Sequence, residues 1–353
     1  MALRINRAAA EAIVFGGAVL GGGGGGWLEH GLEMARDAIA AEFDTVLDIE
    51  DFADGLLATA SMVGSPAAPE RHLEAEDFAR SVNLLDSLLD GQRVRGLIAS
   101  ECGAVACING WYQAARLGLH AVDAPCDGRA HPSAQMGSLG LHLDPAFVSR
   151  QSAAGGLRSA GRYVELAVSA SLDRASALVR QSAVQAGGLV AVARNPVPAA
   201  VVRSGGALGA IRQALAVGQA LLAGAPNTAA ARVAESLGGR VVARGAVSEV
   251  QLDSRGGFDL GLVRLAAGGQ ALEVSFYNEY MTLDGDGERL ATFPHLIMLI
   301  DPKRARPIIS AEVTVGLTVD VIAVPRDRLI LGAGLRDEQL MIETGKIIGR
   351  SLT

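Results

Sequence analysis

The chain has 353 residues, 50% of them hydrophobic, which exceeds the usual limit of a single core and predicts two globular domains. Its formal net charge of −7, with no basic block and only 4% aromatic residues, argues against a nucleic-acid partner. Apolar runs end short of the roughly 20 residues that a membrane helix needs and only three cysteines occur, so we expect a cytoplasmic protein without a membrane span.

The first 160 residues alternate strand-like and helix-like segments. The apolar run Ala12–Leu20 is predicted to be a strand or buried segment, the glycine run Gly21–Gly26 breaks it, and apolar residues then recur at helical spacing over Trp27–Ala41. The further elements predicted here are a strand at Thr45–Ile49, a loop at Ser61–Pro69, a helix at Phe78–Leu89, a strand at Gly96–Ser100, a helix at Cys107–Leu117 and a strand at Leu119–Asp123. This alternation predicts an α/β domain, residues 1–160, with a mostly parallel sheet and flanking helices.

Residues 161–353 have a different texture, because strand-like runs follow one another at close spacing. Helices are predicted at Ala207–Leu222 and Asn227–Leu237. The predicted strands lie at Tyr163–Ser169, Gly188–Ala193, Arg240–Leu252, Leu260–Leu265, Leu272–Tyr277, His295–Ile300 and Val319–Val324. We therefore expect a β-rich α+β second domain.

The glycine run is the first candidate for a binding site. Glycines before a helix let backbone N–H groups approach an anion, and the helix N-terminus favours negative charge. The run lacks the Lys-Ser/Thr of a phosphate-binding loop and a convincing acidic partner for a ribose, so a nucleotide is the weakest interpretation. A loop that binds another small ligand, through Gly23, Gly24 and Gly25, and simple tight packing both remain open.

A polar segment that follows a predicted strand is the second candidate. It carries Asp123, Cys126, Asp127, Arg129 and His131 within nine residues. Ligands of α/β sheets bind beyond the carboxyl ends of the strands, so a site is expected here. The aspartates alternatively cap turns and Cys126 is then a small buried hydrophobe, while Arg129 is able to clamp a carboxylate in either case.

Three further positions carry polar groups next to predicted strands. Glu101 follows a strand directly, and we leave open whether it is a general base, a ligand or a turn residue. Asn278 and Glu279 follow a strand of the second domain. His295 begins another strand in apolar surroundings, where a hydrogen-bonded core histidine is the usual outcome.

These residues belong to a pattern that runs nearly end to end and resembles the S-methyl thiohydantoin desulfurase-like family, whose members often occur alongside hydantoinase and oxoprolinase proteins. In the first half the resemblance rests on Gly21–Gly26, Glu101 with Gly103, 114–119 leading to Asp123, 128–130, Pro132, Gln135 and Met136. In the second half it rests on 256–258, Asn278 with Glu279, Pro294, 296–297, Asp301, Pro307, Gly316 and Leu317.

The resemblance implies an α/β domain and a β-rich domain with a site between them. For members that act as desulfurases it implies attack of water on the carbon that bears the S-methyl group, which releases methanethiol and leaves a hydantoin. This sequence departs from the common family pattern, which has an aromatic residue in place of His131, an acidic residue in place of Ser133, a glycine in place of Ala104 and an aspartate in place of His295.

Because two of these departures create histidines near Cys126, we expect Cys126, His131 and His295 to bind a divalent metal, and their ligand types suit zinc. A zinc-bound water has a pKa of about 7 and would supply hydroxide for attack at C2. Glu101 or Asp127 would then carry the proton to the departing thiolate.

The substrate-binding residues predicted around this centre are Gly23, Gly24, Gly25, Asp123, Arg129, Asn278 and Glu279. The predicted function is hydrolysis of a small cyclic thiohydantoin- or hydantoin-type substrate. The alternative is a non-catalytic accessory subunit of a hydantoinase- or oxoprolinase-type enzyme, and homo-oligomerisation is left open.

Overall fold

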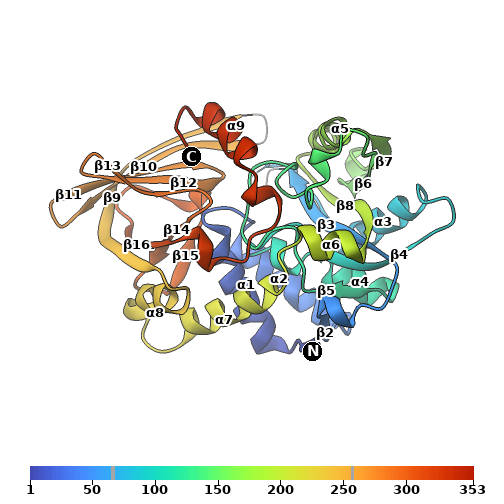
Figure 1. Ribbon diagram of the computed structural model, residues 1–353, viewed down its shortest axis with the longest axis horizontal. Coiled ribbons are helices and arrows are strands. Elements are labelled where there is room, and N and C mark those ends of the chain that lie inside the picture. Colours follow the sequence, from blue (N-terminus) through green and yellow to red (C-terminus); the bar gives the residue numbers. More distant parts are fainter. Residues whose placement is uncertain (65–67, 256–257) are drawn as a thin grey trace.

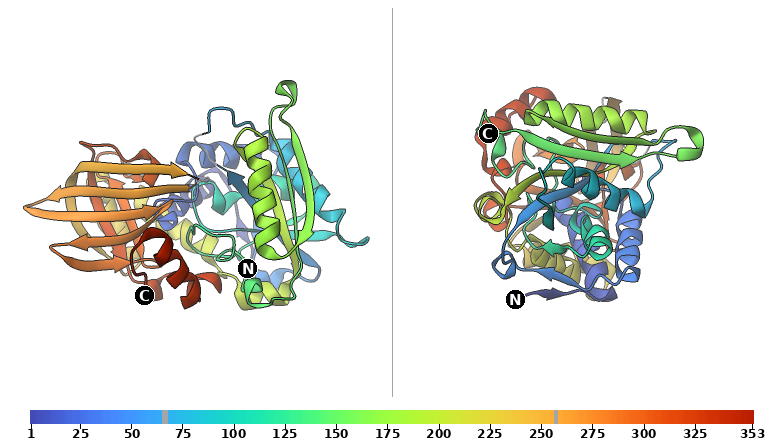
Figure 2. Two further views of the ribbon diagram at one scale, coloured as in Figure 1. Left: turned by 90° about the horizontal axis from the view of Figure 1, so that it is seen from above. Right: turned by 90° about the vertical axis from the view of Figure 1, so that its right-hand side faces the viewer.

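The computed structural model describes residues 1–64, 68–255 and 258–353. They form two eight-stranded sheets, one from residues 3–198 and one from residues 240–324, which lie at opposite ends of the molecule with α1 and α7 between them (Figure 1). Figure 2 shows the same separation from above. Gly256 and Gly257, which contribute to the family pattern, and residues 65–67 of the predicted loop lie outside the described residues.

The first sheet is mixed and has the strand order β1-β2-β5-β4-β3-β8-β6-β7. Parallel pairing joins β2 to β5, β5 to β4 and β4 to β3, whereas the other pairs are antiparallel. The strands are β1 Leu3–Arg4, β2 Thr45–Leu47, β3 Leu56–Gly64, β4 Val94–Ala99, β5 His120–Val122, β6 Ser149–Gly155, β7 Val164–Ala170 and β8 Leu189–Pro198. The helices of this part are α1 Arg7–Gly21, α2 Leu28–Ala40, α3 Ala75–Asp86, α4 Trp111–Leu117, α5 Leu172–Gln185 and α6 Ala199–Gly205.

The second sheet is antiparallel at each of its described pairs and has the order β13-β12-β11-β10-β9-β16-β14-β15. Its strands are β9 Arg240–Arg255, β10 Phe258–Ala267, β11 Gln270–Tyr277, β12 Glu279–Gly285, β13 Glu288–Thr292, β14 Leu296–Asp301, β15 Arg306–Ile308 and β16 Thr318–Val324. The helices are α7 Ala210–Leu222, α8 Ala229–Ser236 and α9 Glu338–Ile348. The predicted α/β half and β-rich half are confirmed.

The parallel part of the first sheet is smaller than expected, because its later strands return to it antiparallel. Strands β7 and β8 belong to this sheet although they follow residue 160. The division into 1–160 and 161–353 stays a prediction. In the part of the chain that the structure describes, no helix is both long enough and apolar enough to cross a bilayer, and the cytoplasmic location also stays a prediction.

Of the two alternatives predicted for Ala12–Leu20, the strand is wrong, because these residues lie in α1, whereas the buried segment agrees with the structure. The helix begins after Asn6, whose side chain accepts a hydrogen bond from the Ala9 N–H, and ends at Gly22 in the left-handed conformation. A short apolar run does not distinguish a buried strand from a buried helix. The glycine run therefore joins two helices, α1 and α2, rather than a strand and a helix.

Helix α1 holds the two halves of the molecule together. It contacts α2 on one side and β14, β15 and α7 on the other, and its apolar residues belong to a core that continues into the second sheet. Its approach to α7 is close because glycines lie at the crossing. A Cβ added at Gly16 would overlap the Ala214 carbonyl oxygen, and one added at Gly218 would overlap the Ala12 carbonyl oxygen.

Replacement of Gly218 by alanine is expected to destabilise the fold. Alanine favours a helix by about 1 kcal/mol over glycine, but its methyl group forces α1 and α7 apart, and such overpacking costs about 1–3 kcal/mol or more. Chemical unfolding should show a net loss, whereas Gln219→Ala, on the exposed side of the same helix, should stay within about 0.5 kcal/mol of the wild type. A Gly218→Ala protein as stable as the wild type would contradict the described crossing.

Candidate active site between the two halves

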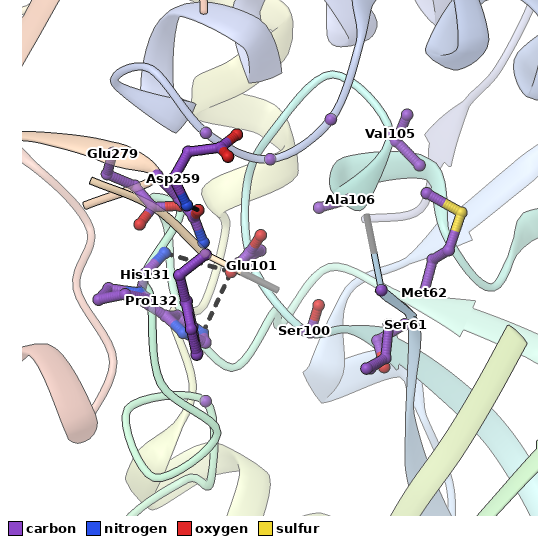
Figure 3. Close-up of a pocket in the computed structure, with 18 of the residues that line it drawn as sticks. Ser61, Met62, Ser100, Glu101, Val105, Ala106, His131, Pro132, Asp259 and Glu279 are labelled. Carbon is purple, nitrogen blue, oxygen red and sulfur yellow. Dashed lines mark hydrogen bonds and ion pairs between the residues drawn. The ribbon is translucent and has the colours of Figure 1, made fainter. Parts of the chain in front are cut away.

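A cleft of about 440 Å³ lies where the two halves meet. It is lined by the glycine run, the end of β3, the segments that follow β4, β5 and β15, and residues of α5, β8, β9, β10 and the start of β12. Figure 3 shows Glu101, His131, Asp259 and Glu279 grouped on one side of it, with Ser61, Met62, Val105 and Ala106 on the other. Chain segments far apart in sequence thus form one small-molecule-sized site.

The glycine run forms one wall because it is pressed between both halves. Gly25 has a φ of 78°, and a Cβ added there would overlap the Gly103 backbone. A Cβ added at Gly24 would overlap the Glu279 carboxylate oxygen. Only glycine lets the backbone of the run lie this close to Glu279 on one side and to Gly103 on the other. The run is therefore tightly packed, as one interpretation of the sequence held, and it also lines the cleft.

The carbonyl groups of the run accept hydrogen bonds from both halves. The Tyr280 N–H donates to the Gly22 oxygen over 2.7 Å and the Ser310 N–H donates to the Gly23 oxygen over 2.9 Å. On the other side, the Val105 N–H donates to the Gly25 oxygen over 3.0 Å. These bonds fix the cleft wall to β12 and to the segment after β4.

Glu101 and His131 form the central pair of the cleft. The His131 N–H donates to Glu101 Oε2 over 3.2 Å, and His131 Nε2 lies 3.3 Å from the same oxygen. Burial raises the pKa of Glu101 to about 7, although the His131 N–H and the nearby arginines oppose this. Burial lowers the pKa of His131 to about 4, so its imidazole is neutral at pH 7 and the contact is not an ion pair between two charges.

The His131 imidazole is buried at the edge of the cleft. Neither ring nitrogen makes a hydrogen bond of good geometry with a described residue, although Nε2 lies 3.3 Å from Glu101 Oε2. A buried polar group whose hydrogen bonding is incomplete is costly and usually marks a functional position.

Glu279 and Asn278 line the cleft from the second half, and their binding of substrate stays a prediction. Glu279 is 2% exposed and its Oε2 has no hydrogen-bond partner in the described part of the chain. Burial, reinforced by the charge of Glu101, raises its pKa well above the ordinary value. Asn278 Oδ1 accepts a hydrogen bond from the Asp259 N–H over 2.9 Å, so its amide holds the local backbone.

Asp123, Cys126 and Asp127 lie outside the cleft lining. Asp123 accepts hydrogen bonds from the Ile211 and Arg212 N–H groups over 2.7 and 3.2 Å, at the first turn of α7. Asp127 Oδ1 accepts from the Gly332 N–H over 2.6 Å. The structure therefore places both aspartates as backbone partners, the structural alternative that the sequence left open.

Cys126 is a buried thiol beside Thr59, with 3.2 Å between Sγ and Oγ1. Burial raises its pKa to about 12, which keeps the thiol protonated. A protonated thiol is a poor nucleophile and a poor metal ligand. The position is consistent with the interpretation of Cys126 as a small buried hydrophobe.

Arg129 also lies outside the lining of the cleft. It is fully buried, its Nη1 donates to the Pro294 and His295 carbonyl groups over 3.1 and 2.6 Å, and its guanidinium lies 4.4 Å from the centre of the Phe293 ring. Gly22 packs against its Nη2. Arg129 thus supports the segment before β14 and the glycine run from behind.

The three predicted metal ligands are not brought together. His131 lines the cleft, whereas Cys126 does not, and His295 turns its Nδ1 to the Arg326 N–H, which donates to it over 3.1 Å. Among the residues described, no group of three histidine, cysteine, aspartate or glutamate side chains is arranged to hold a metal ion. These ligands do not fit a zinc site, and no chemical step is derived through one.

Several cleft residues were not identified from the sequence. They are Ser61, Met62, Arg180, Arg194, Asp259 and Ser310. The predicted loop at Ser61–Pro69 concealed the first two, because β3 continues to Gly64. Arg194 had a usable signal, since an arginine within an apolar strand-like run is unusual. Arg180 had none, because it lies on an amphipathic helix.

Two globular halves that enclose a cleft with a buried carboxyl–imidazole pair define a two-domain protein with a cleft of small-molecule size between its domains. The model of the S-Me-THD-like N-terminal domain matches residues 8–155, and that of the S-Me-THD-like C-terminal domain matches residues 170–333. The chain belongs to this S-methyl thiohydantoin desulfurase-like family, as its residue pattern predicted.

A crystal structure of a protein from Chromobacterium violaceum is similar to this chain with a TM-score of 0.74. The two sequences are 21% identical, and the match covers 99% of each chain. At this identity the likeness shows the shared fold. No curated protein matches the chain.

Replacement of Arg129 by lysine is expected to lower stability rather than substrate affinity. Lysine keeps the positive charge, but it lacks the planar guanidinium group that donates to two carbonyl groups and packs on Phe293. The free energy of unfolding should therefore fall by about 3 kcal/mol. Chemical unfolding measures this loss. Unchanged stability together with weaker binding of a carboxylate ligand would instead support the clamp predicted from the sequence.

Proposed function

We propose that the cleft hydrolyses a small cyclic thiohydantoin- or hydantoin-type substrate, with water attacking C2 of an S-methyl thiohydantoin. Membership in the S-Me-THD-like family supports this class of substrate. The volume of about 440 Å³ suits a five-membered ring with a short side chain. In this proposal Glu101 is the catalytic base.

The observation that carries the proposal is the buried Glu101 carboxyl, whose pKa burial raises to about 7. A general base works best when its pKa is near the operating pH, because it is then partly ionised and still holds a proton well. Its position in a cleft beside a buried imidazole whose hydrogen bonding is incomplete is typical of functional sites.

In the proposed reaction Glu101 takes a proton from water as the water oxygen bonds to C2. The electron pair of the C2–N double bond moves to the ring nitrogen. The C2–S bond then breaks, and Glu101 returns its proton to the methanethiolate. The second water proton moves from the new hydroxyl to the ring nitrogen, so the products are a hydantoin and methanethiol. Neutral His131 hydrogen-bonds the ring and orients it for attack.

The Gly23–Gly25 segment contributes the shape of the wall against which the ring lies. Burial raises the pKa of Glu279 well above its ordinary value and so favours the protonated carboxyl, which is able to donate a hydrogen bond to the ring. Gly24 packs against this carboxyl group. Asp123, Asp127 and Arg129 hold the surrounding backbone in this mechanism. The accessory-subunit alternative calls for a closed or filled cleft, and the volume of the cleft supports an enzyme instead.

Binding of a divalent metal stays a prediction, and the mechanism above does not depend on it. Metal content of the purified protein, measured by elemental analysis for the wild type and His131→Ala, tests it. If the wild type carries one metal ion per chain and His131→Ala carries none, the ion lies in the cleft and has ligands other than Cys126 and His295.

Glu101→Gln is expected to lower the rate of methanethiol release from an S-methyl thiohydantoin by about 10²–10⁴-fold, because the amide cannot accept the proton. For the wild type, kcat/KM should fall about tenfold per pH unit below pH 7, where Glu101 is protonated, and level off above it. A thiol-specific dye measures the product.

The matched control is Glu235→Gln, an exposed glutamate on α8, which should keep wild-type activity and pH dependence. Glu101→Gln that retains activity, or a wild-type profile that is flat between pH 5 and 8, would remove Glu101 as the base. Absence of methanethiol with the wild type, with and without added zinc, would contradict the proposed reaction itself.

A further inference from the structure

Two arginines that the mechanism does not use line the same cleft. Arg180 comes from α5 and Arg194 from β8. The Arg180 guanidinium lies 4.4 Å from the centre of the Phe258 ring, which also lines the cleft. Arg194 Nη2 donates to Ser61 Oγ, which places its guanidinium against the end of β3.

Neither arginine has a carboxylate partner. No ion pair joins Arg180 or Arg194 to an acidic side chain among the described residues, and the buried Nε of Arg194 has no hydrogen-bond partner there. Burial lowers the pKa of both side chains, and the charge of Arg180 lowers that of Arg194 further. Two cations are thus held near each other with partial loss of water.

Arg306, another partly buried arginine, is neutralised. It pairs with Glu29 and with Glu312. A cation that loses water without a partner is costly. Arg129 is also buried without an acidic partner, but two carbonyl groups and the Phe293 ring contact its guanidinium and it does not line the cleft. An anionic ligand would supply what the two arginines of the cleft lack.

We propose that Arg180 and Arg194 form the subsite for a carboxylate on the side chain of the substrate. This inference rests on the proposed function for the position of the ring. Arg194 lies opposite Thr59 on β3, Thr59 lies opposite Ile98 on β4, and Glu101 follows Ile98 by three residues. The side chains of Arg194 and Glu101 line the same cleft. A ring at Glu101 with a short acidic side chain is therefore able to reach Arg194.

In this proposal Arg180 and Arg194, rather than Arg129, bind the carboxylate of the substrate. Guanidinium groups bind carboxylates through parallel N–H···O bonds, and the two oxygens of one carboxylate are able to serve both arginines. Arg180 stacks on Phe258 and so offers its charge with little loss of side-chain freedom. The substrate class is accordingly a thiohydantoin that carries a carboxylate, rather than a neutral one.

The test compares binding of hydantoin-5-acetate with that of its uncharged primary amide, by isothermal titration calorimetry at pH 7.5. The wild type should bind the carboxylate about 10- to 100-fold more tightly, as expected for a charge-assisted bidentate contact. Arg180→Met, which keeps the packing on Phe258, should reduce the preference to about threefold or less. Arg194→Met should act in the same direction.

The matched control is Arg174→Met, an exposed arginine on the same helix, which should keep the wild-type preference. Equal affinities for acid and amide in the wild type, no binding of either, or an unchanged preference in Arg180→Met would each overturn the subsite. Arg180→Met remains decisive if Arg194→Met does not fold. Inorganic phosphate at 10 mM should not displace the acid; full displacement would indicate a non-specific anion site and overturn the proposal.

Failure of the subsite and failure of the proposed reaction are distinguishable. A wild type that prefers the acid but releases no methanethiol from an S-methyl thiohydantoin bearing the same acetate would retain the subsite and lose the reaction. Release of methanethiol at equal kcat/KM from acidic and amide substrates would retain the reaction and lose the subsite.

Discussion

The backbone contact of the glycine run is the constraint on which the site depends. Gly24 lies against the Glu279 carboxylate and Gly25 against Gly103, and neither contact leaves room for a side chain. Because Glu279 belongs to the second half of the chain and Gly103 follows Glu101 in the first, this single segment sets the distance between the two carboxyl groups. The close crossing of α1 and α7 also positions this segment, because α1 leads directly into it.

Burial without neutralisation then determines the chemistry of the cleft. It brings the pKa of Glu101 to about 7, keeps His131 neutral and leaves Arg180 and Arg194 without acidic partners. The cleft thus combines a buried acid–base pair with two arginines that lack acidic partners, which suits the proposed substrate, an uncharged reacting ring with an anionic side chain. The physical cause of these pKa shifts is the same in each case, because desolvation disfavours isolated charge.

The sequence predicted both halves of the fold and the position of Glu101 beyond a strand, because strand–helix alternation and strand ends are local features. It did not identify α1, since nine apolar residues suit a buried helix and a buried strand equally. It also placed Cys126 and His295 with His131, although only tertiary packing decides which neighbours in sequence share a cavity. Arg180 was missed because it lies on an amphipathic helix, whereas Arg194 was missed although an arginine within an apolar strand-like run is an unusual feature.

The measurement that tests this account most directly is a titration of the Glu101 carboxyl itself. Carbon-13 NMR of protein labelled at the glutamate side-chain carboxyl, compared with Glu101→Gln, identifies its resonance. We predict a resonance that titrates near pH 7 in the wild type and is absent from the variant. If the wild-type resonance that disappears in Glu101→Gln instead titrates near the ordinary glutamate pKa of about 4.3, the account is contradicted.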